Sequence, residues 1–275
     1  MDRPREMRYA HLMQITSASN EKIKHAKRVR EGKEPGLIFI EGLRLAEEAF
    51  RSALTIEMAF SLSGSELSPA LSQTLDQQQI PVFEVTPDIM RALGDTVQPQ
   101  GIILLAQRPV ANLTPDHSLE SSLWLGLDRL QDPGNVGTLL RTAEAAGVTG
   151  IVALKGCADA YAPKVLRSAM GSAFRLPIQA NASAETLTSF QKAGVKVVVA
   201  AGDGEMDYDR YDWTQSTLLL LGNEGRGVAP ELMQQSDVRL RIPMQAGVES
   251  LNVAAAGAVM LFEAARQRRL KTATA

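Results

Sequence analysis

Apolar and polar positions follow two periods along the chain, and the first hundred residues show both. Residues 36–42, GLIFIEG, form a short apolar run typical of a buried strand. Residues 43–53, LRLAEEAFRSA, carry apolar positions three and four apart, which predicts an amphipathic helix, and residues 20–31 predict another with Asn20 as its N-cap. The same alternation continues in TIEMAFSL, SPALSQTLDQQ, IPVFEV and GIILLAQ. We therefore expect a compact α/β domain over residues 1–110.

A second alternating series begins near residue 123. The preceding segment 111–122 is rich in Pro, Asn, Asp and Ser and is predicted to be a linker. Strands are then expected at LWLGLD, GIVALKG, LPIQA, VKVVVAAG, TLLLLG and VRLRIPM, with helices at about 135–146, APKVLRSAM, AETLTSFQKAG and NVAAAGAVMLFEAARQRR. Nearly continuous apolar strands are typical of a parallel sheet that is buried on both faces. Residues 123–275 therefore predict a mostly parallel sheet with helices on both sides.

Composition narrows the class of protein. The chain is 45% hydrophobic and 22% charged, and it contains no apolar run near the ~20 residues that cross a bilayer. The first residues, MDRPREMRYAH, lack the apolar core of a secretory signal. Cys157 is the single cysteine, and the three histidines (His11, His25, His117) are scattered, so no local spacing predicts a zinc site. We expect a cytoplasmic protein without a membrane span or a metal.

Basic residues are concentrated in two places although the net charge is only −2. Near the C-terminus, RQRRLK contains four cations and no acid. Such clusters can bind phosphate backbones, or they can be a solvated helix face and a tail, and charge alone leaves both interpretations open. The stronger cluster, between residues 22 and 33, includes Lys22, Lys24, Lys27, Arg28 and Arg30.

The stretch LLLLGNEGRGV, residues 218–228, joins a buried strand to a turn with glycines at 222, 225 and 227. This spacing matches neither the phosphate loop GxxxxGK[ST] nor the dinucleotide fingerprint GxGxxG, and the chain has no GxSxG nucleophile motif. An oxidoreductase that uses a nicotinamide cofactor is therefore a weak interpretation.

Two further polar segments lie at predicted strand ends. In residues 127–147, Asn135 and Arg141 are six apart, so they do not lie on one line of a helix. In residues 241–261, Ser250 and Asn252 precede an apolar helix that is expected to be buried. Taken singly, each residue has a plain structural interpretation: a helix N-cap for Asn135, Ser250 or Asn252, and a surface cation for Arg141.

In this order, however, DPGNVGTLLRTAEAAG, LLLGNEGRGV and IPMQAGVESLNVAAAGAVMLFEA resemble the SpoU family of S-adenosylmethionine-dependent RNA ribose 2′-O-methyltransferases, members of the SPOUT superfamily. The N-terminal sequence from ITSASNEKIKHAKRVR to LRLAEEA is similar to the small substrate-binding domain of the ribosomal-RNA branch, which is similar in fold to an RNA-binding ribosomal protein. The resemblance implies a deep trefoil knot, a homodimer and S-adenosyl-L-methionine bound in the knotted loops.

The resemblance also assigns residues. It implies RNA contacts for the basic cluster at 22–30 and ribosomal RNA as the substrate. Because a guanidinium stays protonated, we expect Arg141 to hold a phosphate and stabilise a developing alkoxide rather than act as a base. Glu224 is expected to brace its loop, and Gly222 to let the backbone approach the cofactor. The functional polar residues implied are Asn135, Arg141, Glu224, Ser250 and Asn252, and the cofactor-binding residues are Ala201, Gly202, Gly222, Asn223, Ile242, Met244 and Leu251.

Two alternatives share this fold. One is a tRNA ribose methyltransferase, and the other is a non-catalytic RNA-binding or ribosome-assembly protein. The intact polar residues argue against the non-catalytic alternative, and the N-terminal domain favours ribosomal RNA over tRNA. The sequence does not decide whether the Arg226 side chain faces RNA or solvent.

Overall fold

The computed structural model describes residues 13–96, 98–115, 121–248 and 250–274. The first predicted segment, MDRPREMRYAH, and residues 116–120 of the predicted linker lie outside these described residues. The chain divides into two compact units, described separately here: Met1–Arg108 with Tyr161–Leu166, and Pro109–Ala160 with Arg167–Ala275. Among the described residues, no helix combines the length and apolar character needed to cross a membrane.

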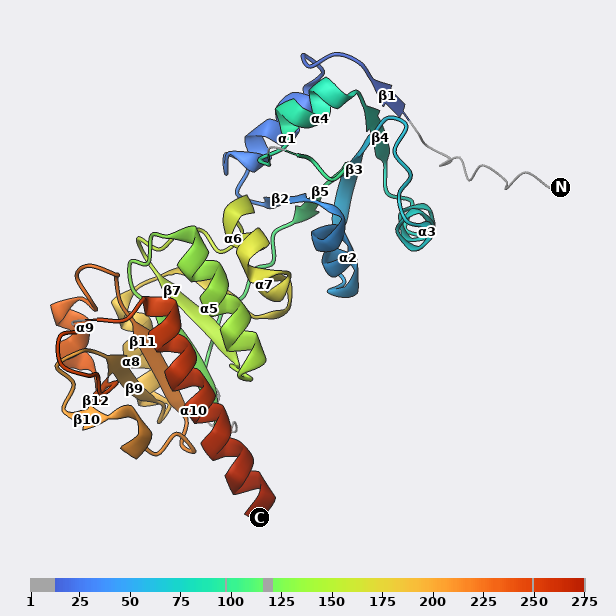
Figure 1. The fold of residues 1–275 in the computed structure, drawn as a ribbon. Helices are drawn as coiled ribbons and strands as arrows, with labels where there is room; N and C mark the ends of the chain where they lie inside the picture. The colour runs from blue at the N-terminus through green and yellow to red at the C-terminus, as the bar shows by residue number, and fades with distance from the viewer. Residues whose placement is uncertain (1–12, 97, 116–120, 249, 275) are drawn as a thin grey trace. The chain divides into compact units, whose positions relative to one another are not determined.

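The first unit contains a mixed sheet of five strands in its described residues, in the order β1-β4-β3-β5-β2 (Figure 1). β4 runs parallel to β1 and β3, whereas β5 is antiparallel to β2 and β3. The five strands are β1 (Met13–Ile15), β2 (Leu37–Glu41), β3 (Ile56–Leu62), β4 (Val82–Val85) and β5 (Ile102–Gln107).

Helices cover this sheet because each carries an apolar stripe. The Asn20 side chain accepts a hydrogen bond from the Lys22 N–H at 2.9 Å, so the predicted N-cap is confirmed. Ile23 and Val29 of α1 and Leu93 of α4 join the core that contains Phe60. β1 and α4 are not predicted from the sequence, since three and seven residues are too short for a clear period. The helices are α1 (Glu21–Arg30), α2 (Leu43–Arg51), α3 (Pro69–Gln77) and α4 (Pro87–Leu93).

The second unit contains a sheet of seven strands in its described residues, in the order β10-β12-β9-β11-β6-β7-β8. Every recorded strand pair is parallel, as the apolar runs predict. The strands are β6 (Leu123–Leu127), β7 (Gly150–Leu154), β8 (Ile178–Ala182), β9 (Lys196–Ala200), β10 (Met206–Asp207), β11 (Thr217–Leu221) and β12 (Val238–Arg241).

Both faces of this sheet are buried. Leu218 and Leu220 of β11 pack with Phe190 in a core on one face. On the other face, a Cβ on Gly257 would lie 2.5 Å from the Leu139 side chain and 2.8 Å from that of Leu221, so this glycine lets its helix approach closely. The helices of this unit are α5 (Pro133–Ala145), α7 (Ser172–Arg175), α8 (Ala184–Lys192), α9 (Pro230–Gln235) and α10 (Val253–Thr274), with a 3₁₀ turn at Tyr208–Arg210. Helix α6 (Pro163–Ala169) is divided between the two units, because its residues up to Leu166 belong to the first.

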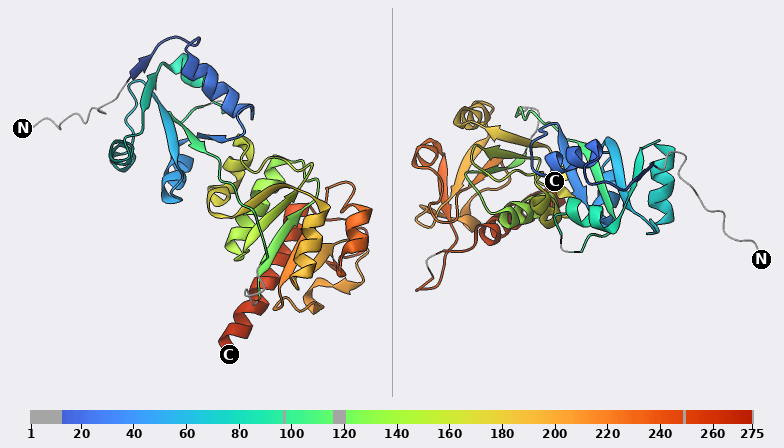
Figure 2. Two further views of the ribbon diagram at one scale, coloured as in Figure 1. Left: turned by 180° about the vertical axis from the view of Figure 1, so that it is seen from behind. Right: turned by 90° about the horizontal axis from the view of Figure 1, so that it is seen from above.

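Helix α10 lies beside α5, and its last turns extend past the sheet in both side views (Figures 1 and 2). The expectation that this apolar helix is buried is correct for only one side of it: Ala254 and Leu261 are buried, whereas Ala255, Val259 and Phe262 are exposed. The short elements α7, α9 and β10 are absent from the sequence-based prediction, which assigns no element to these residues.

Helix α5 begins earlier than predicted. Asp132 is its N-cap, because its carboxylate accepts a hydrogen bond from the Asn135 N–H at 2.8 Å, and Pro133 occupies the first turn. The interpretation of Asn135 as the N-cap is therefore wrong. The Asn135 side chain is left available for partners outside the helix.

Candidate cofactor and substrate site

Three loops of the second unit enclose a cavity of about 490 Å³. They follow β9, β11 and β12, and the carboxyl ends of these parallel strands meet at one edge of the sheet. The first loop contributes Ala201–Asp203, the second residues 222–228, and the third includes Ile242, Met244 and Leu251. The strand order thus brings together segments that are up to about fifty residues apart in sequence.

Most predicted site residues lie at this cavity. All seven residues predicted to bind the cofactor line it: Ala201, Gly202, Gly222, Asn223, Ile242, Met244 and Leu251. Glu224 and Ser250 line it as well. The lining does not include Asn135, Arg141 or Asn252.

Asn135 and Asn252 are connected to the cavity through hydrogen bonds. The Asn252 amide donates to Asn135 Oδ1 at 3.0 Å, and the Asn135 amide donates to Glu224 Oε1 at 3.0 Å. Asn252 Oδ1 also accepts from the Ala254 N–H at 2.9 Å, in the first turn of α10. One chain of polar contacts therefore connects α5, the loop after β11 and the start of α10.

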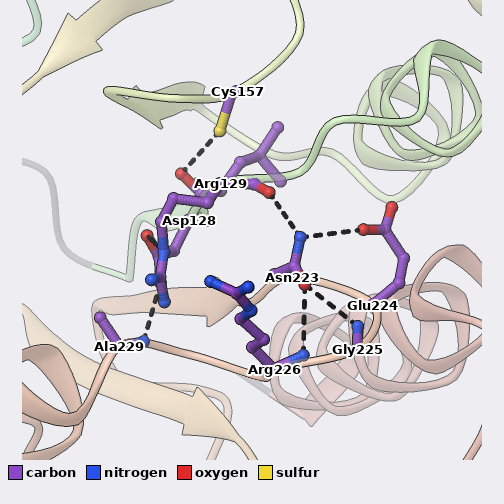
Figure 3. A network of polar contacts seen from close by, with 9 residues as sticks. Asp128, Arg129, Cys157, Asn223, Glu224, Gly225, Arg226 and Ala229 are labelled. Atoms are coloured by element: carbon purple, nitrogen blue, oxygen red, sulfur yellow. Dashed lines mark hydrogen bonds and ion pairs between the residues drawn. The ribbon is translucent and has the colours of Figure 1, made fainter.

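The loop after β11 is held closed by its own backbone. Asn223 and Gly227 exchange two main-chain hydrogen bonds, of 3.1 and 2.8 Å. Asn223 Oδ1 accepts from the N–H groups of Gly225 and Arg226, while its Nδ2 donates to the Arg129 carbonyl at 3.0 Å and to Glu224 at 3.4 Å (Figure 3). Asn223 thus organises the loop that lines the cavity.

The structure gives a different reason for the glycine at position 222 from the one the sequence suggests. A Cβ at this position would lie within 3 Å of backbone atoms of Gly227 and Val228, including 2.6 Å from the Gly227 carbonyl oxygen. Glycine is thus required by the loop's approach to itself, before any ligand is considered.

Arg141 lies on the exposed side of α5 and has no hydrogen bond or ion pair with another residue in the described parts of the chain. The Glu224 carboxylate, in contrast, accepts from two amides, those of Asn135 and Asn223. A carboxylate held in this way is suited to bracing a loop, whereas an exposed guanidinium without a protein partner is suited to binding an anionic substrate.

Several cations of the basic cluster on α1 form hydrogen bonds or ion pairs with other residues of the same unit. Arg30 donates to the carbonyls of Ala92, Leu93 and Gly94 at 2.9–3.3 Å and so caps the end of α4. Lys24 pairs with Glu21. The remaining members of the cluster are Arg28, which pairs with Glu34, Lys22, which lies over the Phe83 ring, and Lys27, which is half-buried.

The C-terminal cluster includes another structural cation. Arg268 donates to the main-chain carbonyls of Ser121, Ser122, Trp213 and Gln215, and burial lowers the pKa of this guanidinium. Arg268 is therefore not part of a free basic tail.

Two residues beside the cavity loop are missed by the sequence-based prediction. Asp128 is only 3% exposed, and Arg129 has a positive φ of 53°. Nearby, burial raises the pKa of the Cys157 thiol, which donates to the Leu127 carbonyl. The sequence sign that could have pointed to Asp128 is a carboxylate directly after an apolar strand, at the end of LWLGLD.

No group of three metal-binding side chains is found within the described residues.

A cavity formed by loops at the carboxyl ends of parallel strands, lined by glycines together with polar and apolar side chains, is typical of a small-molecule or cofactor site in an α/β protein. The family model described as the SpoU rRNA Methylase family matches residues 122–262, and that of the MRM3-like substrate binding domain matches residues 20–104. The chain belongs to the SpoU rRNA methylase family. The prediction of an S-adenosylmethionine-dependent RNA methyltransferase is thereby confirmed.

Known proteins resemble the chain over nearly its whole length. An uncharacterised tRNA/rRNA methyltransferase of a Synechocystis species is 34% identical over 92% of this chain and 94% of its own. The 23S rRNA (guanosine(2553)-2′-O)-methyltransferase RlmP of Bacillus subtilis is 33% identical over 91% of this chain and 98% of its own. The crystal structure of an AdoMet-bound rRNA methyltransferase from Sinorhizobium meliloti has a TM-score of 0.83 at 29% identity, covering 93% of this chain and 98% of that one.

The fold class expected from the sequence is confirmed by these relatives. A mostly parallel sheet with helices is joined by an N-terminal α/β domain, and the structural neighbours are SpoU methyltransferases, the class that has the trefoil knot.

Proposed function

We propose that this protein transfers the methyl group of S-adenosylmethionine to a ribose 2′-hydroxyl of 23S-type ribosomal RNA. The observation that carries the proposal is the hydrogen-bonded chain from Asn252 through Asn135 to Glu224. It joins all three segments that resemble the family, and it does so beside the cavity predicted to bind the cofactor.

The cavity suits a nucleoside cofactor. Its volume of about 490 Å³ lies within the roughly 300–1,000 Å³ typical of small-molecule sites. Apolar side chains such as Val228, Leu240 and Met260 line it beside loop backbone, which can recognise an adenine edge. S-adenosylmethionine, when bound, supplies a methyl group activated by a sulfonium. The residues that would hold it are Ala201, Gly202, Gly222, Asn223, Ile242, Met244 and Leu251.

The polar residues take distinct roles in this proposal. Arg141 binds the phosphate next to the target ribose and stabilises negative charge that develops on the 2′-oxygen. Ser250 and Asn135 orient the ribose, while Glu224 and Asn252 hold the loops in place. Because methyl transfer is an in-line displacement, alignment of the two reacting atoms supplies much of the acceleration.

Residues 1–110 are proposed as the RNA-binding domain, 111–122 as a linker and 123–275 as the catalytic domain. The match of residues 20–104 to an MRM3-like substrate binding domain supports an N-terminal RNA-binding domain, and the similarity to relatives such as RlmP, which is named a 23S rRNA methyltransferase, supports ribosomal RNA over tRNA. Within α1, the proposed RNA contacts are Lys22, Lys24, Lys27 and Arg28. Arg30 supports them from within the domain, because its guanidinium caps α4.

A homodimer that acts on RNA in the cytoplasm is part of the same proposal. Val259 and Phe262, three residues apart on α10, are 37% and 48% exposed, which supports a further contact on this helix. Light scattering coupled to size exclusion tests the dimer: a mass near 60 kDa is expected from the 29.7 kDa chain, and a monomer at micromolar concentration contradicts it.

The direct test is transfer of tritium from labelled S-adenosylmethionine into RNA. Purified protein is incubated with total RNA from a strain that lacks the gene, and ribose methylation is then mapped by resistance to alkaline cleavage. One labelled site in large-subunit ribosomal RNA supports the proposal. Label in tRNA supports the tRNA alternative, and cofactor binding without label in any RNA or ribosomal particle supports the non-catalytic alternative.

A further inference from the structure

Asp128 holds both ends of the loop that lines the cavity. It directly follows β6, and its main-chain N–H donates to the carbonyl of Leu221, the last residue of β11, at 2.8 Å. Its carboxylate Oδ2 accepts from the N–H of Ala229 at 2.8 Å (Figure 3). Leu221 and Ala229 are the residues immediately before and after residues 222–228. Asp128 therefore fixes the distance between the two ends of this loop.

Arg129 adds a third attachment point. Its carbonyl accepts from the Asn223 amide at 3.0 Å, and its guanidinium donates to both carboxylate oxygens of Asp128 at 3.1 Å. A φ of 53° is uncommon for a residue other than glycine, and it turns this carbonyl toward the loop.

The corner formed by Asp128 and Arg129 is itself anchored on its other side. The Cys157 thiol donates to the carbonyl of Leu127, and the Ala158 N–H donates to the carbonyl of Leu130 at 2.7 Å. The residues before and after the corner are thus fixed by the turn that follows β7. This anchoring lets the corner act as a rigid support for the loop.

The loop depends on such a support because it contains three glycines in seven residues, and glycine restricts the backbone least. A buried carboxylate is also unfavourable unless it is partnered, and the partners of Asp128 are the Ala229 N–H and Arg129. Loss of the carboxylate therefore releases the far end of the loop and leaves the Arg129 guanidinium without its ion pair.

We propose that Asp128 is a positioning residue that keeps the loop 222–228 in its cofactor-binding shape before the cofactor arrives. This inference rests on the proposed function, because it takes the cavity as the S-adenosylmethionine site. Asp128 does not line the cavity and so acts through the loop backbone. Preorganisation of this kind raises affinity by removing the ordering step from binding.

The test compares Asp128→Ala, Asp128→Asn and the control Asp237→Ala. Asp237 accepts a hydrogen bond from the Val197 N–H, also at 2.8 Å, but at the other end of β9 and outside the cavity lining. Calorimetry measures the Kd for S-adenosylmethionine, and steady-state assays give KM and kcat. We expect Asp128→Ala to raise the Kd and the cofactor KM at least tenfold, with kcat at saturating cofactor changed less than threefold.

Asp128→Asn keeps an oxygen that can accept from Ala229, so we expect its Kd to stay within threefold of the unmodified protein. Asp237→Ala should lower Tm but leave the Kd unchanged. A folded Asp128→Ala variant with unchanged Kd, or an Asp237→Ala variant with an equal loss of affinity, overturns the inference. If the unmodified protein binds no S-adenosylmethionine, the proposed function fails instead.

Hydrogen exchange decides the matter if Asp128→Ala does not fold. In the unmodified protein without cofactor, the Ala229 amide and the hydrogen-bonded amides of Gly225, Arg226 and Gly227 should be protected, and their protection should be similar in Asp128→Asn, which keeps the acceptor for Ala229. An Ala229 amide that exchanges at the rate of an unstructured peptide overturns the inference.

Discussion

Replacement of Gly222 by alanine should disable the cavity loop. The added methyl group would meet backbone atoms of Gly227 and Val228, and backbone cannot rotate away as a flexible side chain can. The loop must therefore open, which breaks the two main-chain hydrogen bonds between Asn223 and Gly227. Each such bond contributes about 0.5–1.5 kcal/mol, so their loss amounts to roughly 1–3 kcal/mol.

Because the loop has to close again when the cofactor binds, this free energy is subtracted from binding. Affinity for S-adenosylmethionine should fall roughly 5- to 150-fold, measured by calorimetry, and Tm should also fall. Gly225→Ala is the matched control for stability, since its Cβ would find its nearest neighbour, Asn223 Oδ1, at an ordinary 3.8 Å. A Gly222→Ala protein with unchanged Tm and unchanged Kd would refute the reasoning.

Three further predictions follow from the same contacts. Arg141→Ala and Arg141→Lys should lower kcat by roughly 10²–10³ while Tm and cofactor Kd stay unchanged, because the side chain is exposed and has no partner in the described residues; unchanged turnover in both removes its catalytic role. Arg30→Ala should destabilise the N-terminal unit by about 1–3 kcal/mol in urea unfolding, whereas Lys27→Ala should weaken RNA binding without that loss; equal stability of the two variants contradicts the capping role. Since burial raises the pKa of Cys157, iodoacetamide at pH 8.5 should alkylate the folded protein more slowly than the urea-unfolded one, as followed by mass spectrometry.

The sequence predicted the longer helices because they extend over several repeats of their period, and it predicted the central strands because each forms an almost continuous apolar run. The strands around Leu125, Val198 and Leu219 consist mainly of apolar residues, and they form the centre of the parallel sheet. The missed elements, such as β1, α4 and α9, have three to seven residues, and their formation depends on neighbours in the sheet rather than on a local pattern.

The start of α5 shows where local rules left a choice. Asp132 and Asn135 are both good N-caps, and the sequence does not decide between them. In the folded chain the Asn135 side chain meets Glu224, 89 residues away, while the Asp132 carboxylate caps the helix.

The sequence by itself determined the α/β class, the family and the three segments that form the site, because apolar periods and short motifs are local properties. Only the tertiary structure decided which side chains work together. Strand order brings the ends of β9, β11 and β12 to one cavity, and it places Asp128 across the loop from Leu221 to Ala229. The structure also shows why position 222 must be glycine: the sequence suggests close approach to the ligand, whereas in the fold the loop's own backbone leaves no room for a Cβ. The physical reason is that hydrogen bonds and close packing between distant segments leave no pattern in the sequence near either partner.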